Sequence, residues 1–180
     1  MKTNPLQSES FNLFYRNAEI NDIPKLQQIC DSWTDKLLVE GEEFEPNYIA
    51  NCIKNGDLPP IENAKVENYS IKAICHKKDN EIIGFFDIYQ GYPSNDVLWI
   101  SMFVIDRAFQ KSGFGSEIID LLSQNAKENG FKALGIGVHL KNHKAQLFWV
   151  KNRFDKILEF QYDIKFNVDT SPVIKMMKII

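Results

Sequence analysis

Two neighbouring segments decide the fold: Val97-Leu98-Trp99-Ile100-Ser101-Met102-Phe103-Val104-Ile105 and, four residues later, Gln110-Lys111-Ser112-Gly113-Phe114-Gly115. In the first segment both alternate sets of side chains are mostly apolar, which is typical of a strand covered on both faces. The second segment precedes a helical pattern, and its glycines let successive main-chain N–H groups point into one concavity, where the helix adds its partial positive charge. The two segments predict a strand, a loop that binds phosphate or diphosphate, and a helix.

Other phosphate loops fit this segment poorly. A P-loop needs a different glycine spacing followed by Gly-Lys-Ser/Thr, and the dinucleotide fingerprint needs a glycine where Ile118 stands. Two glycines alone could also form nothing more than a tight turn between strand and helix. Five of the nine glycines fall between positions 113 and 137, however, and this concentration favours a binding loop.

The sequence after the loop alternates between helix and strand. A helical pattern ends at Asn129-Gly130, a strand is expected over 133–140, and a second helix over 142–152. This order favours neighbouring parallel strands at 97–105 and 133–140. Two further strands are expected at 156–164 and 173–180.

The sequence before the loop predicts the rest of a mixed sheet. A strand is expected at 11–17, one long amphipathic helix from Asp22 to about residue 38, and a short helix between Pro46 and Gly56. A hairpin follows, with strands over 69–75 and 81–89. We find no repeat or linker, so residues 1–180 are expected to form one α/β (α+β) domain, with residues 1–10 as a flexible N-terminal lead.

Composition excludes several classes of protein. Of 180 residues, 44% are hydrophobic and 25% charged, and no apolar run approaches the roughly 20 residues of a membrane helix. The absence of a secretory signal predicts a cytoplasmic address without membrane association. A net charge of −3 argues against nucleic acid as a partner. Three widely spaced cysteines, and no His/Asp/Glu cluster with ligand spacing, predict reduced thiols and no metal.

Two motifs in register resemble the GNAT superfamily of N-acetyltransferases. The loop beginning at Gln110 is similar to the acetyl-CoA motif Q/R-x-x-G-x-G/A, which lies between a strand and a helix in that family. Asn142-His143-Lys144-Ala145-Gln146-Leu147-Phe148-Trp149-Val150-Lys151-Asn152-Arg153-Phe154 resembles the second motif, N-x-x-A-x-x-L/F-Y-x-x-x-G-F. The opening at Arg16 to Pro24 is also like the usual start of the family, and the order of elements matches from about residue 10 onward.

The resemblance implies a fold and a cofactor. The fold is a mixed, mostly antiparallel central sheet of about six to seven strands, with a splayed parallel pair and about four flanking helices; acetyl-CoA lies in the V between the parallel strands. The main chain of Phe103, Val104 and Ile105 would meet the pantetheine arm, and Asn142 the pantetheine or adenosine part. The loop that begins at Gln110 would hold the diphosphate, and two aromatic rings would pack beside the pantetheine arm. These residues are Lys111, Ser112, Gly113, Phe114, Gly115 and Ser116 in the loop, and Phe148 and Trp149 in the wall.

The sequence departs from the family pattern at two positions. The usual tyrosine, a frequent general acid toward the leaving thiolate, is replaced by Trp149, whose indole N–H cannot transfer its proton at useful pH. Another residue or solvent would then serve as acid. The usual glycine before the last phenylalanine is replaced by Arg153, so the turn after this helix is expected to be made differently.

Three residues are candidates for acid–base catalysis. His139 ends the second parallel strand, and an imidazole has a suitable pKa, although a histidine paired with backbone is equally compatible with the pattern. Asp87 lies in an apolar strand, either as a half-buried carboxylate with a function or on a solvated face. Tyr89, like Tyr92, could line the acceptor pocket, donate a proton or simply pack.

The acceptor implied by the resemblance is an amine, on a small molecule or a peptide. Acidic residues around the first helix and its loop would attract a cationic amine, unless they form only a solvated loop; they are Asp35, Glu40, Glu42, Glu43 and Glu45. Trp33 and Trp99 are expected in the core. Two alternative functions stay open: a CoA-binding module without transferase activity and another nucleotide-phosphate-binding protein. The chain could also form a homodimer.

Overall fold

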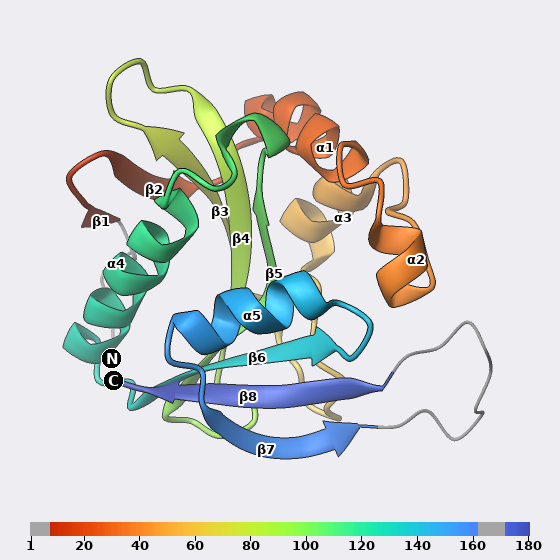
Figure 1. Ribbon diagram of the computed structural model, residues 1–180, viewed down its shortest axis with the longest axis vertical. Coiled ribbons are helices and arrows are strands. Elements are labelled where there is room, and N and C mark those ends of the chain that lie inside the picture. Colours follow the sequence, from red (N-terminus) through yellow and green to blue (C-terminus); the bar gives the residue numbers. More distant parts are fainter. Residues whose placement is uncertain (1–7, 162–171) are drawn as a thin grey trace.

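One mixed sheet organises the computed structural model, which describes residues 8–161 and 172–180. Every neighbouring pair of strands is antiparallel except β5 with β6. This confirms the predicted mixed sheet with one parallel pair, with the two-residue β1 as an extra edge strand within the expected N-terminal lead (Figure 1). Residues 1–7 of that lead and 162–164 of the expected strand lie outside the described residues. The strand order across the sheet is β1 (Ser8–Glu9), β2 (Leu13–Asn17), β3 (Tyr69–His76), β4 (Ile82–Gln90), β5 (Val97–Ile105), β6 (Ala133–His139), β8 (Val173–Ile179) and β7 (Lys156–Gln161).

Helices cover both faces of the sheet (Figure 1). α1 (Ile23–Asp31) and α3 (Tyr48–Asn55) bury Leu26, Ile29 and Ile49 against one face, and α2 (Lys36–Glu40) lies beside them. α4 (Phe114–Glu128) and α5 (His143–Lys151) bury a second apolar cluster on the other face. None of the helices in the described part of the chain is long and apolar enough to cross a bilayer.

The long helix expected from Asp22 to about residue 38 is wrong, because the chain breaks into α1 and α2. The hydroxyl of Ser32 donates to the carbonyl of Ile29 (2.7 Å) and helps to end α1. Leu37, which continued the apolar pattern in the sequence, is 53% exposed. Lys36 is buried instead, with its Nζ 3.3 Å from the Glu40 carboxylate and 4.8 Å from the ring centre of Phe44. The face of α2 that is buried is therefore that of Lys36, against Phe44, and not the one that continues the apolar pattern of α1.

The parallel strands diverge halfway along β5. Their pairing runs from Val97 opposite Ala133 to Ile100 opposite Ile136 and then stops. Beyond this point β5 continues beside β4, and β6 continues beside β8. The predicted splayed pair is therefore present, and the gap between the strands opens toward their carboxyl ends.

Candidate active site

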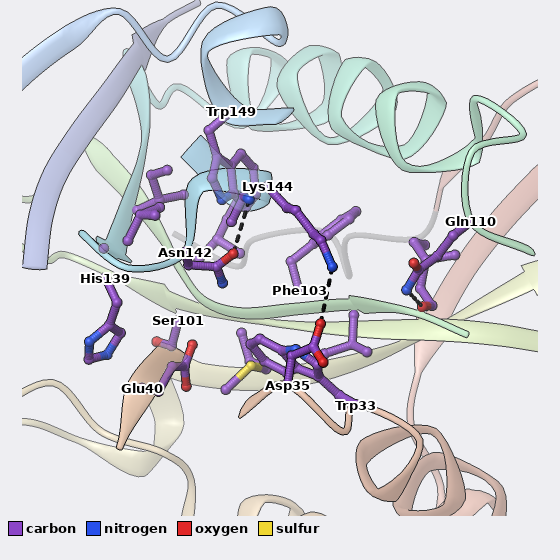
Figure 2. A pocket seen from close by; sticks show the side chains of 18 of the residues that line it. Trp33, Asp35, Glu40, Ser101, Phe103, Gln110, His139, Asn142, Lys144 and Trp149 are labelled. Atoms are coloured by element: carbon purple, nitrogen blue, oxygen red, sulfur yellow. Dashed lines mark hydrogen bonds and ion pairs between the residues drawn. The ribbon is translucent and has the colours of Figure 1, made fainter. Parts of the chain in front are cut away.

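A cavity of about 430 Å³ fills the gap between the diverging strands. Its floor is the second half of β5 and the end of β6, one wall is the segment from the end of α1 to α2, and the other is the start of α5 (Figure 2). The lining residues are Ser32, Trp33, Thr34, Asp35, Glu40, Ile100, Ser101, Met102, Phe103, Val104, Ile105, Arg107, Gln110, Lys111, Ile136, Gly137, Val138, His139, Asn142, Lys144, Ala145 and Trp149.

The structure brings about half of the expected cofactor residues to this cavity. Its lining includes Phe103, Val104, Ile105, Gln110, Lys111, Asn142 and Trp149. The side-chain amide of Gln110 donates to the carbonyl of Ile105 (2.9 Å), so the loop is tied to the end of β5. The remaining loop residues, Ser112 to Ser116, and Phe148 lie beyond the lining and extend the site toward the start of α4.

The loop has the backbone shape that an anion requires. Lys111 has φ +64° and Gly113 has φ +87°, both in the left-handed region, and Gly113 is the N-cap of the 15-residue α4. Within the described ranges no side chain caps this helix, and a Cβ on Gly113 would have no atom within 4 Å. The first N–H groups of α4 are therefore open to a ligand, beside the positive charge of Lys111. A diphosphate fits this donor set.

Gly115 is needed for packing, since its backbone has no positive φ. A Cβ on Gly115 would lie 3.1 Å from the ring of Phe148, so α4 and α5 approach closely here. Phe148 stacks on Phe103 (5.8 Å between ring centres), and Trp149 meets Phe103 edge to face (5.6 Å). Of these three rings, those of Phe103 and Trp149 line the cavity, and an aromatic wall beside a cofactor arm stays a prediction.

The end of α5 corrects the expectation that Arg153 would make the turn differently. Arg153 has φ +69°, the left-handed conformation that glycine favours at this position. Its N–H donates to Val150, and the N–H of Phe154 donates to Trp149, which is the Schellman pattern. The ring of Phe154 also contacts that of Trp149 (4.8 Å). Arg153 therefore adopts the left-handed conformation that glycine usually has in a Schellman motif, and α5 ends in the same way as it would with a glycine at this position.

Two acidic residues, both from the segment between α1 and the end of α2, line the cavity. Asp35 forms an ion pair with Lys144 across the cavity (3.1 Å), as Figure 2 shows. Glu40 also lines the cavity and pairs with Lys36, whereas Glu42, Glu43 and Glu45 do not reach the lining. Trp33, expected in the core, lines the cavity as well. Asp35 and Glu40 belong to the acidic set expected near the acceptor, whereas the place of Trp33 depends on the break after α1, which the sequence pattern does not indicate.

Of the three candidates for acid–base catalysis, His139 alone lines the cavity. Asp87 is fully buried and does not lie on a solvated face. Its carboxylate accepts hydrogen bonds from the N–H groups of Ser101 (3.1 Å) and Met102 (2.7 Å) and from the hydroxyl of Tyr69 (2.9 Å). Tyr89 is buried too, and its hydroxyl accepts from the N–H of Lys65 (3.0 Å).

Burial raises the pKa of Asp87 from 3.8 to about 7, and the nearby charge of Asp57 adds to this effect. The hydrogen bonds from Met102, Tyr69 and Ser101 act in the opposite direction, because they stabilise the ionised carboxylate. Asp87 therefore titrates near neutrality without access to the cavity. Over residues 8–161 and 172–180, no three His, Cys, Asp or Glu side chains gather as a metal site.

Comparison with known proteins places this arrangement in a class. Solved structures with the same fold include an acetyltransferase from Thermus thermophilus (16% identity, TM-score 0.68, covering 94% of this chain and 98% of that chain). Another is the acetyltransferase from Salmonella typhimurium that modifies the N-terminal serine of ribosomal protein L7/L12 (17%, 0.69, 95% and 96%). A third is a ribosomal L7/L12 α-N-protein acetyltransferase in complex with coenzyme A (18%, 0.67, 95% and 96%). At these identities the likeness establishes the acetyltransferase fold.

The sequence itself establishes the family. The profile of the "Acetyltransferase (GNAT) family" matches residues 28–154, which include the loop, both parallel strands and α5. The chain belongs to the GNAT acetyltransferase family, which uses acetyl-CoA. A search of curated protein sequences gives no significant match.

Proposed function

We propose that this protein transfers an acetyl group from acetyl-CoA to a primary amine by direct attack within a ternary complex. The observation that carries the proposal is the cavity where β5 leaves β6, whose lining includes the start of the loop at Gln110 and Lys111 and the carboxylates of Asp35 and Glu40. The N-terminus of α4, which follows this loop, suits a diphosphate, and the carboxylates suit a cationic amine. The floor between them would hold the thioester within reach of both.

The main chain would do most of the binding. The backbone of Phe103 to Ile105 has no partner strand on its β6 side and can pair with the amides of the pantetheine arm, as an added strand would. N–H groups near Val104 would polarise the thioester carbonyl. The start of α4 would hold the diphosphate. Because the three cysteines are buried and none lines the cavity, no acyl-enzyme is proposed.

His139 is the proposed general base. It lies at the end of β6 in the cavity lining, where it can receive the proton that the amine loses during attack. Tyr89 and Asp87 are set aside for this role, because neither lines the cavity. For the acid, Trp149 lines the cavity at the usual tyrosine position but cannot supply a proton, so solvent or another residue would protonate the leaving thiolate.

The acceptor is proposed to be a cationic amine, on a peptide or a small molecule. Asp35 and Glu40 would attract it electrostatically. Two of the structural neighbours acetylate the ribosomal protein L7/L12, and a protein N-terminus is one acceptor of this class. A cytoplasmic location and a homodimer stay predictions from the sequence.

A binding assay and a release assay test the proposal. Acetyl-CoA is expected to raise the melting temperature, whereas ATP and NAD are not. With a panel of amines that includes peptide N-termini, amino acids, polyamines and aminoglycosides, the protein should release free CoA thiol. Stabilisation by acetyl-CoA without thiol release from any amine would favour a CoA-binding module, and stabilisation by ATP or NAD alone would favour another nucleotide-binding protein.

A further inference from the structure

β5 carries a bulge at the point where it leaves β6 and begins to line the cavity. In the β4–β5 pairing, Phe86 lies opposite Phe103 and Ile88 lies opposite Ile100. A single residue of β4, Asp87, therefore faces two residues of β5, Ser101 and Met102. A bulge of this kind bends the strand and shifts the alternation of its groups by one residue. The last residue of β5 that pairs with β6 is Ile100, immediately before the bulge.

The side chain of Asp87 occupies the place of the missing ladder partner. One oxygen, Oδ1, accepts from both N–H groups of the bulge, at 3.1 Å from Ser101 and 2.7 Å from Met102. The other oxygen, Oδ2, accepts from the hydroxyl of Tyr69 on β3 at 2.9 Å. Both bulge residues line the cavity, while Asp87 lies behind them with no exposed surface. An unpaired buried N–H is costly, so two such donors at one bulge require an acceptor.

We propose that Asp87 is a positioning residue that holds the bulge at Ser101 and Met102 and thereby sets the direction in which Phe103 to Ile105 leave β6 to line the cavity. Asp87 does not touch a substrate and acts through the main chain of β5. This inference rests on the proposed function, because it concerns the strand that would bind the pantetheine arm and polarise the thioester.

The surroundings of Asp87 separate this role from that of a general base. Its two oxygens already accept three hydrogen bonds. On its other side lie the phenol groups of Tyr69 and Tyr48, the thiol of Cys52 and the carboxylate of Asp57, which belong to β3, α3 and the segment after α3. Tyr48 donates to Asp57 (3.1 Å). None of these residues lines the cavity, so no group connects Asp87 to an acceptor except the backbone of β5.

Two substitutions distinguish positioning from proton transfer. Asp87→Asn keeps an oxygen for the two N–H groups and an amide N–H for Tyr69, but it cannot act as a base near neutrality. We expect its kcat to stay within threefold of wild type, with an unchanged pH–rate profile. Asp87→Ala removes the acceptor, and we expect at least a tenfold rise in the Kd for acetyl-CoA and at least a tenfold fall in kcat. Tyr69→Phe removes only the contact with Oδ2 and is the matched control, with both constants near wild type.

The outcomes decide the proposal in either direction. If Asp87→Asn lost as much activity as Asp87→Ala, the charge itself would be needed and positioning would be wrong. Unchanged constants in a folded Asp87→Ala protein would equally overturn it. If Asp87→Ala does not fold, the kcat and pH–rate profile of Asp87→Asn compared with those of wild type still decide between positioning and proton transfer.

A spectroscopic readout is independent of activity. The amide proton resonances of Ser101 and Met102 should shift with pH as Asp87 titrates in wild type, and should not shift in Asp87→Asn. Amide shifts of Ser101 and Met102 that stayed constant over the whole pH range in which wild type is folded would contradict the contact. If wild type bound no acetyl-CoA at all, the proposed function would fail, while the amide shifts would still report whether Asp87 holds the bulge.

Discussion

β5 is one strand with two unlike halves. From Leu98 to Ile100 it is paired on both sides, with β4 and β6, and every side chain from Val97 to Ile100 is buried. From Phe103 to Ile105 it is paired with β4 alone, and most of the side chains from Ser101 onward are partly exposed beside the cavity. The first half holds the sheet together, whereas the second half leaves one edge of the backbone open. The bulge against Asp87 separates the two.

Under the proposed function, this difference means that packing and ligand binding fall to successive segments of the same strand. Substitutions near the first half should change the free energy of unfolding and leave ligand affinity alone. Substitutions near the second half should do the reverse. Substitutions near each half therefore test whether packing and ligand binding are separated along β5.

The largest effect is expected at the loop beside the second half. Gly113→Asp places bulk and a negative charge where the diphosphate should lie, so acetyl-CoA affinity should fall by at least about 100-fold. Isothermal titration calorimetry measures it. The matched control is Gly130→Asp at the other end of α4, because both glycines have φ +87° and open space around the missing Cβ. Equal affinities for the two variants would place the diphosphate elsewhere.

His139→Ala tests the chemistry at the end of β6. Loss of a general base should lower kcat by about 10- to 100-fold and remove the corresponding limb of the pH–rate profile, with little change in the Kd for acetyl-CoA. The exposed His143, which does not line the cavity, provides the control His143→Ala. An unaltered profile in His139→Ala would eliminate this residue as the base.

Gly135→Ala should destabilise the packing around the first half of β5 without affecting the second half. A Cβ on Gly135 would lie 2.6 Å from the ring of Trp99, so this ring must move, and the free energy of unfolding should fall by about 1 to 3 kcal/mol. Acetyl-CoA affinity should be unchanged. For comparison, Gly137→Ala lies in the cavity lining and meets its nearest atom at 3.1 Å. We expect Gly137→Ala to lower the free energy of unfolding less than Gly135→Ala does, and to change the affinity for acetyl-CoA. The opposite result would contradict the assignment of packing to the first half of β5 and ligand binding to the second.

The pH dependence of the free energy of unfolding reports on the boundary between the two halves of β5, because Asp87 accepts hydrogen bonds from the bulge there. Because the folded pKa of Asp87, about 7, exceeds its ordinary value of 3.8, the group stabilises the fold fully below about pH 4 and loses this contribution as pH rises through 7. The free energy of unfolding of wild type should therefore fall relative to that of Asp87→Asn by about 2 kcal/mol between pH 5 and pH 8. Urea titrations across this range measure it. Parallel curves for the two proteins would show that Asp87 keeps an ordinary pKa.

The smallest effect is expected at the end of α5, away from both halves. Arg153→Gly relieves a left-handed arginine, so the melting temperature should rise, by an amount equivalent to about 0.5 to 1 kcal/mol. Arg153→Ala keeps the strain and serves as the control. A lower melting temperature for Arg153→Gly would mean that contacts of the arginine outweigh its backbone strain.

Much of the site was predictable because it depends on local patterns. The limits of β5, the glycine loop and the end of α4 at Asn129 follow from uninterrupted apolar residues and from glycines, whose effects act within a few positions. The parallel pairing of β5 and β6 follows from the order of elements. The aromatic wall was predicted from the family motif, and the ring contacts of Phe148 and Trp149 agree with it.

What could not be predicted depends on contacts distant in the sequence. Leu37 continued the apolar pattern of α1, but the chain turns after α1, and α2 buries Lys36 against Phe44 instead of Leu37. Asp87 could have been solvated, because nothing in its own strand indicates that two donors of β5 converge on it. The conformation of Arg153 was missed since an arginine rarely adopts positive φ.

Under the proposed function, the interruption between α1 and α2 would let acceptor preference change without affecting the binding of acetyl-CoA. Ser32 to Asp35 belong to no strand or helix, yet they supply four consecutive positions of one wall of the cavity. Exchanges or insertions there would reshape that wall and leave the loop before α4 intact. A variant library confined to these four positions would then sample new acceptors at small cost in folding.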